Sequence, residues 1–157
     1  MVVVLVISIL LAIAIPVFLG TRATSYARAA QTNLRTALTA ERTSLLTSYS
    51  RLYVVDASST EPSLTWQTTN PAAGTNQVQV VLSADGTAVV LVAQGQDGNC
   101  YYLEDASSPV SNPEAFYGKA ASSARTCPSW GSVASGGVNS APAGITSGGA
   151  TASAAGW

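Results

Sequence analysis

The first nineteen residues form an unbroken apolar run, and this run most limits how the chain can fold. Met1 to Leu19 contain no charged residue, and Ser8 is the only clearly polar one. A helix of this length is just long enough to cross about 30 Å of hydrocarbon. A core helix of a soluble domain would have a polar face, and this segment has none. Residues 1–21 are therefore predicted to form a helix that is covered by lipid or by copies of itself.

A cleaved secretory signal is the main alternative for this segment. Ala12-Ile13-Ala14 has the small residues of a cleavage site. A signal peptide would also have a basic start and a shorter apolar centre, but this run has no basic start and continues past Ala14. The sequence therefore favours a retained anchor.

Two residues mark a place where this helix can change shape. Pro16 removes one backbone hydrogen bond and crowds the carbonyl four residues earlier, although neighbouring groups can compensate in a membrane helix. One interpretation is a kink near the end of the run. The other is that the segment from Ser8 to Val17 unwinds when it leaves lipid, with Ser8 and Pro16 favouring the melting.

A second helical stretch follows without a break. From Arg22 to about Tyr53 the chain contains neither glycine nor proline. Its apolar residues recur at steps of three, four and seven, which places them on one helical face. They are Tyr26, Ala30, Leu34, Leu38, Leu45, Tyr49 and Leu52. Residues 22–53 are thus predicted to continue the first helix as an amphipathic one, giving a total length of about 80 Å.

A stripe of arginines lies on another face of this stretch. Arg28, Arg35 and Arg42 are spaced by sevens. A solvated helix face is the plain interpretation. However, residues 1–53 hold five arginines against one glutamate, whereas the rest of the chain holds two basic and seven acidic residues. The two parts therefore carry opposite net charge. This favours electrostatic contact between residues 1–53 of one copy, called the stem below, and the remaining residues of the next copy.

The pattern after Tyr53 changes to that of a small sheet. Residues 54–76 read as a connection with one short extended candidate at 63–67. Residues 77–130 carry two strand patterns around an Asp-Gly turn and a third strand from Cys100. The two patterns cover residues 77–82 and 87–92, and the third covers residues 100–103. An antiparallel sheet of three strands needs a cover, and the helix from about Leu34 onward is the available one.

The chain has only two cysteines, Cys100 and Cys127. Two reduced structural thiols are one possibility, but a bridge is favoured because the head is expected to be exported. The bridge would close a loop with little regular pattern and stabilise the head by roughly 3–4 kcal/mol under the chain-entropy model. Beyond it, residues 131–157 are almost entirely small and uncharged, which predicts a flexible tail.

The residues argue against catalysis and cofactor binding. The chain has no histidine, the usual general base and the commonest metal ligand. No spacing links a nucleophile to a base, and Asp97-Gly98-Asn99 fits a turn better than a calcium loop. A net charge of −1 gives no basic surface for nucleic acid. We therefore predict no catalytic residue, no metal site and no cofactor.

Met1–Leu19 closely resembles the N-terminal helix of type IV pilins and pseudopilins, and Ala29–Glu41 looks like its continuation. The head is similar to theirs only in layout, as a connection, an antiparallel sheet and a disulfide-closed C-terminal loop. Cys100–Leu103 and Tyr117-Gly118 look like bacterial pilins of the actinobacterial type. The fold implied is α+β: a long N-terminal helix, half in the membrane or filament core, packed against a small antiparallel sheet.

The resemblance implies a structural role. Such subunits wait in the inner membrane, and an assembly machine then packs their apolar helices into an extracellular helical homopolymer. The filament-core or membrane residues implied here are Val4, Ile7, Leu11, Ile15, Pro16 and Phe18, and Ser8 to Pro16 matches the part that loses helicity in family filaments. The family's leader and its pairing glutamate precede the position of Met1, so neither role is assigned to a residue of this sequence.

Three alternatives to a major pilin remain at this point. A pseudopilin of a type II secretion system would form only short polymers. A single-pass membrane-anchored binding module would work as a monomer and would leave the helix face of residues 22–53 unexplained. A secreted enzyme is disfavoured by the missing histidine. Pili serve adhesion, motility, DNA uptake or secretion, and the sequence does not choose among these.

Overall fold

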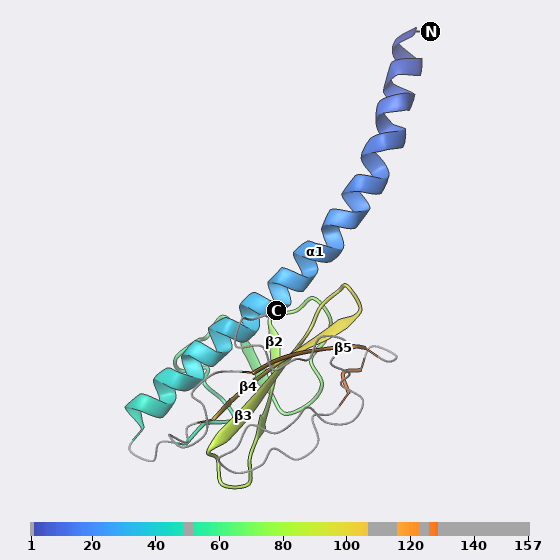
Figure 1. The fold of residues 1–157 in the computed structure, drawn as a ribbon. Helices are drawn as coiled ribbons and strands as arrows, with labels where there is room; N and C mark the ends of the chain where they lie inside the picture. The colour runs from blue at the N-terminus through green and yellow to red at the C-terminus, as the bar shows by residue number, and fades with distance from the viewer. Residues whose placement is uncertain (1, 49–51, 107–115, 123–125, 129–157) are drawn as a thin grey trace.

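The computed structural model describes residues 2–48, 52–106, 116–122 and 126–128, with the side chains of residues 14–20, 106 and 116 excepted. One helix is followed by five strands, so the fold is α+β. In Figure 1 the second half of the helix lies along one face of the sheet, while its first half extends away from it. The sheet and its connections are called the head below. The predicted tail, residues 131–157, lies outside the described residues.

Helix α1 (Val2–Thr47) is a single helix of 46 residues. It ends earlier than the expected limit near Tyr53. At its end, hydroxyl side chains bond back to the helix: Thr47 Oγ1 donates to the Thr43 carbonyl at 2.9 Å. Farther on, the Tyr53 amide donates to the Gly86 carbonyl at 3.0 Å. The Tyr53 amide could not make this bond to the head if it were bonded within α1. Contacts with the head therefore compete with the helical pattern that the sequence shows up to Tyr53.

The five strands form one sheet in the order β1-β2-β3-β4-β5. Their bounds are β1 (Thr65–Gln67), β2 (Gln77–Leu82), β3 (Ala88–Gln94), β4 (Asn99–Ala106) and β5 (Phe116–Ala121). Strand β1 pairs with β2 in parallel, and the other pairs are antiparallel. The expectation of a purely antiparallel sheet is therefore wrong. The connection of residues 68–76 returns the chain to the starting end of β1, which a parallel neighbour requires.

The predicted hairpin is confirmed between β2 and β3. Gly86 has a φ of +70°, the left-handed conformation that glycine accepts without cost. Asp85 Oδ1 accepts from the Ser83 hydroxyl at 2.7 Å and the Thr87 hydroxyl at 2.8 Å. The short polar side chain of Asp85 thus fixes the turn locally, as expected of an Asp-Gly pair.

Strand β5 lies in a segment for which the sequence predicts an irregular loop. It pairs antiparallel with β4, with Tyr101 opposite Lys119. Gly118 and the nearby prolines hide the strand in the sequence, whereas the open edge of β4 supplies its backbone partners. The predicted bridge between Cys100 and Cys127 is confirmed, with a Cα–Cα distance of 5.6 Å.

Two apolar clusters lie on opposite faces of the sheet. The first joins α1 to the strands and contains Ala30, Leu34, Ala37, Leu38, Val89, Leu91, Tyr101 and Leu103 among others. The second contains Ala88, Val90, Val92, Cys100, Tyr102 and Cys127. Strand β3 is buried along its whole length because it contributes alternate residues to both. The helix thus covers one face of the sheet, starting at Ala27 rather than Leu34, and leaves its own N-terminal half outside the head.

Candidate functional site: the exposed arm and its anchor

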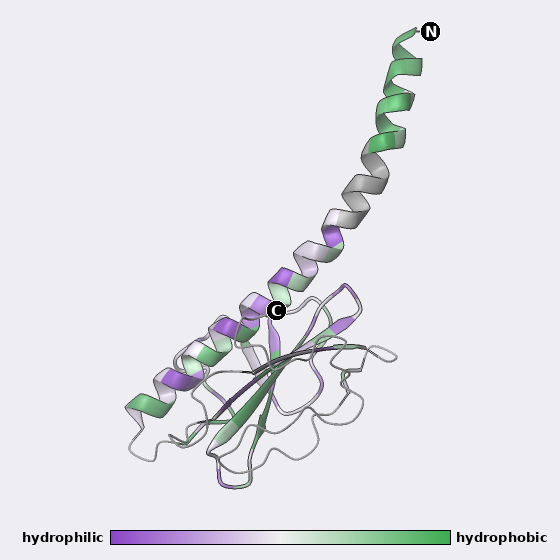
Figure 2. Ribbon diagram, viewed as in Figure 1, coloured by the Kyte–Doolittle hydropathy of each residue, from purple (hydrophilic) through white to green (hydrophobic). Residues whose placement is uncertain are grey.

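Residues 2–13 of α1, called the arm below, project from the head with their side chains in solvent (Figure 1). Ten large apolar side chains are exposed there, from Val2 at 76% to Val6 at 48%. Figure 2 shows this end of the helix as a continuous hydrophobic segment. Among the described residues, Ala27 is the first of α1 that packs against an apolar cluster. The head therefore leaves the arm uncovered.

The arm is apolar around its whole circumference. Three of the expected filament-core residues lie in it: Val4, Ile7 and Leu11 are 68%, 50% and 53% exposed. Ile9 and Leu10, which point in other directions, are exposed as well. A helix that is apolar on every side needs apolar neighbours on every side. The other expected residues, Ile15, Pro16 and Phe18, lie where α1 is helical but its side chains are not described.

The segment predicted to melt is helical in this structure. Helix α1 continues through Pro16 without interruption. The Ser8 hydroxyl donates to the Val4 carbonyl, four residues earlier, at 2.8 Å. Such a bond satisfies the hydroxyl within its own helix. Melting between Ser8 and Pro16 remains a prediction for the assembled state.

The sequence predicts that residues 1–21 span a membrane. Within the part of the chain that the structure describes, no helix is sufficiently long and apolar to span a membrane.

A salt bridge fastens the C-terminal end of α1 to the sheet. The Arg42 guanidinium donates through Nε and Nη2 to the two carboxylate oxygens of Asp105, both at 2.8 Å. The Tyr53 hydroxyl donates to the same carboxylate at 2.8 Å. Hydrogen bonding to Asp105 raises the pKa of Arg42, and burial followed by the Asp105 charge raises that of Tyr53. A helix residue, a loop residue and a strand residue are thus joined at one carboxylate.

Glu41 lies beside this anchor and is fully buried. Its Oε2 accepts a hydrogen bond from the Val54 amide at 3.1 Å, whereas its Oε1 has no hydrogen-bond partner among the described residues. Burial raises the pKa of this carboxyl to about 7, against the opposing effect of the Val54 bond. The sequence analysis uses Glu41 in the charge balance of residues 1–53 and does not predict its burial. Its position seven residues after Leu34, on the apolar face, was the signal that could have found it.

The three arginines of the predicted stripe have different surroundings in the structure. Arg28 and Arg35 are exposed and lie on the side of α1 that faces away from the apolar cluster. Arg42 is engaged with Asp105 of its own chain, with its side chain 46% exposed. Of the three arginines predicted to contact a neighbouring subunit, Arg28 and Arg35 are therefore the better placed.

No group of residues suited to hold a metal ion occurs in the described ranges. Asp97-Gly98-Asn99 forms the β3–β4 turn, in which Gly98 has a φ of +78°. Asp97 Oδ2 accepts from Asn99 Nδ2 and from the Tyr101 hydroxyl, both at 2.6 Å. The carboxylate of this turn is thus directed into the turn itself.

Comparison with protein-family models, with curated proteins and with solved structures gives no match.

Proposed function

We propose that this chain is the structural subunit of an extracellular helical filament of the type IV pilin class. The observation that carries the proposal is the arm, which exposes ten large apolar side chains beside a head that has packed cores of its own. Burying one Val, Leu or Ile side chain contributes roughly 1.5–3 kcal/mol. The ten side chains are already partly covered by their own helix, so their combined gain is smaller than ten full burials and of the same order as the cost of association, which is about 4–15 kcal/mol.

Copies of the same chain are the partner that fits the arm best. The resemblance of Met1–Leu19 to pilin helices implies bundling of identical arms, with the heads outside. Exposed Arg28 and Arg35 on the stem, against a mainly acidic head, favour the same packing. The resemblance implies two further partners: a pilus assembly machine, and the inner membrane that holds the subunit before assembly. The Cys100–Cys127 bridge fits an oxidising compartment outside the cell.

The test is filament formation by cells that produce the full chain. Filaments are sheared from the surface, labelled with an antibody against the head and viewed by electron microscopy. We expect filaments from the wild type and none from the double variant Ile7→Asp with Leu11→Asp. These side chains are half exposed in the subunit, so charge there should block packing of the arm without unfolding the head.

The matched control exchanges the same positions for apolar side chains, as Ile7→Leu with Leu11→Ile, and should keep its filaments. Circular dichroism in detergent checks that the aspartate variant retains its head. Filaments that survive both aspartates would contradict the proposal. Short polymers only would indicate the pseudopilin alternative, and a chain that never leaves the monomeric state would indicate an anchored binding module.

A further inference from the structure

A second feature of the head is a hollow that the filament proposal does not use. It lies between the connection of residues 72–73, the β3–β4 turn and the end of β5, and has a volume of about 560 Å³. Cavities of this size hold small organic ligands in other proteins. Its lining residues are Ala72, Ala73, Gln94, Gly95, Gln96, Gly98 and Ser122.

Hydrogen bonds fix the three walls relative to one another. The Gly74 amide donates to the Gln94 carbonyl at 3.1 Å, which holds the connection to β3. The Ser122 amide and hydroxyl both donate to the Gly98 carbonyl, at 2.9 and 3.0 Å, which holds β5 to the turn. Because the nearby residues are mostly Ala and Gly, their side chains do not fill the space. The hollow is therefore a built part of the head.

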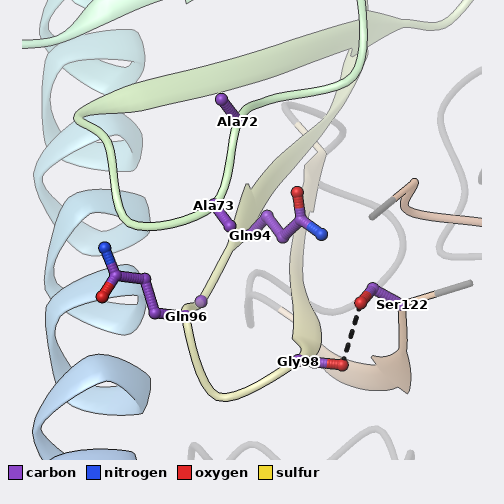
Figure 3. A pocket seen from close by; sticks show the side chains of 7 residues that line it. Ala72, Ala73, Gln94, Gln96, Gly98 and Ser122 are labelled. Carbon is purple, nitrogen blue, oxygen red and sulfur yellow. Dashed lines mark hydrogen bonds between the residues drawn. The ribbon is translucent and has the colours of Figure 1, made fainter. Parts of the chain in front are cut away.

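The Gln94 side chain points into this hollow from the end of β3 (Figure 3). The residue is only 3% exposed. Its Oε1 is buried and has no hydrogen-bond partner within the described part of the chain. A buried polar atom without a partner costs roughly 1–3 kcal/mol. A bound molecule would reach this oxygen after a turn of the Gln94 side chain toward the open space, and a hydrogen bond donated there would recover that cost.

The lining selects the chemistry of the ligand. Among the described residues that line the hollow, none carries a charge, and none has a large apolar side chain. A charged ligand would find no partner charge, and an apolar one would bury little surface. The Gln96 side chain points toward α1, away from Gln94 (Figure 3), and lies against Gly74. The two remaining side-chain acceptors of the described lining are Gln94 Oε1 and Ser122 Oγ, whose proton is given to Gly98. The Gln94 amide also offers an N–H donor beside its oxygen, and neighbouring hydroxyl groups of a sugar match that pair.

We propose that this hollow binds a neutral sugar of mono- or disaccharide size, with the Gln94 amide as the central contact. Ser122 Oγ accepts from a second hydroxyl, and the Ala and Gly residues leave room for the ring. The site does not rest on the filament proposal, because it is formed within one head. It would make the subunit a carbohydrate-binding protein as well as a structural one.

The experiment is a nuclear magnetic resonance titration of the full chain, labelled with nitrogen-15. Because the arm is apolar, the chain is kept in a zwitterionic detergent that has no sugar headgroup. The probes are methyl glycosides of glucose, galactose and mannose, with N-acetylglucosamine and lactose. We expect at least one to shift the Gln94 side-chain amide and the Gly95 and Gly98 backbone signals saturably, with a Kd in the millimolar range or below.

Two variants locate the binding. Gln94→Leu removes the amide at similar size and should weaken binding at least tenfold. Ala73→Leu fills the space while residue 94 stays a glutamine, and it should weaken binding to the same extent, which guards against misfolding of the first variant. Gln31→Leu, the same change on α1 outside the hollow, should leave binding unchanged.

Three outcomes would overturn the proposal. In the first, no sugar shifts these signals, and the hollow holds water only. In the second, shifts occur but neither pocket variant alters them. In the third, the amide probe N-acetylglycinamide binds more tightly than every sugar, which would assign the hollow to peptide groups. Each result leaves the filament proposal untouched, because the titration uses dissociated subunits.

Discussion

Glu41 shows how one carboxyl can make the stability of the head depend on pH. Its ordinary pKa is 4.5, and burial raises this to about 7 in the folded chain. Between these values the folded state binds more protons than the unfolded one, so the free energy of unfolding must fall as pH rises. The difference between the two pKa values corresponds to roughly 3 kcal/mol of the free energy of unfolding. This contribution is fully lost once the pH lies above the folded pKa.

We therefore expect the wild type to lose stability between pH 5 and pH 8. In Glu41→Gln the side chain stays neutral and can still accept from Val54, so this loss should largely disappear. Urea unfolding of both proteins at several pH values measures it. The two should have similar stability at pH 5, and the variant should be the more stable at pH 8. Parallel pH curves would show that Glu41 does not carry the effect.

Arg42 is the second residue whose side chain should affect the stability of the head. Its two hydrogen bonds to buried Asp105 are charge-assisted, and such bonds contribute about 1.5–3 kcal/mol. We expect Arg42→Ala to lower the free energy of unfolding by about 2 kcal/mol, because Asp105 then keeps Tyr53 as its hydrogen-bond donor. Arg35→Ala is the matched control on the exposed face and should cost under about 0.5 kcal/mol. Equal losses of stability in the two variants would contradict the stabilising role of the Arg42–Asp105 salt bridge.

The residue scale also shows what a sequence hides. The apolar face of Ala30, Leu34 and Leu38 follows from spacing alone, and the structure buries all three. The bond between Arg42 and Asp105 does not, because it joins positions 63 residues apart. Spacing places Arg42 on a stripe with Arg28 and Arg35, but only the path of β4 decides which arginine meets a carboxylate.

At the scale of elements, local signals again succeed where distant pairing does not. The β2–β3 hairpin follows from Asp85-Gly86 and from the strand patterns on either side. Strand β5 depends on the edge of β4 for all its backbone partners, and β1 on a return of the chain that no local pattern encodes. The sequence likewise does not predict the hollow beside Gln94, since three separate segments form it.

The disulfide should protect β5 more than the other strands. β5 lies inside the loop that Cys100 and Cys127 close, and among the described strands it pairs with β4 alone. Opening the bridge restores entropy to that loop in the unfolded state, worth about 3–4 kcal/mol in the chain-entropy model. We expect reductant to speed amide hydrogen exchange in residues 116–121 before residues 77–82. Uniform acceleration across both strands would indicate global destabilisation instead.

At the scale of the whole molecule, the charge division between stem and head predicts salt-sensitive assembly. Arg28 and Arg35 are exposed, and most acidic residues belong to the head. Under the filament proposal, Arg28→Glu with Arg35→Glu should reduce the yield of sheared filaments, because opposite charges would become like charges. The variant with both arginines changed to lysine keeps the charge and should assemble. Full filament yield after the reversal to glutamate would remove electrostatics from the assembly.

Because α1 is at once the arm and a layer of the head, the subunit has a defined response to mechanical load. Tension applied along the arm would load the contacts of Ala30, Leu34 and Leu38 with the sheet in shear, all at once rather than one after another. The Cys100–Cys127 bridge lies with the cluster on the opposite face, outside this path of force. Single-molecule pulling on the arm should therefore detach the helix from the sheet at the same force with and without reductant. Tensile strength in this subunit would then reside in the contacts between α1 and the sheet, including the Arg42–Asp105 salt bridge, and the disulfide would stabilise another part of the head.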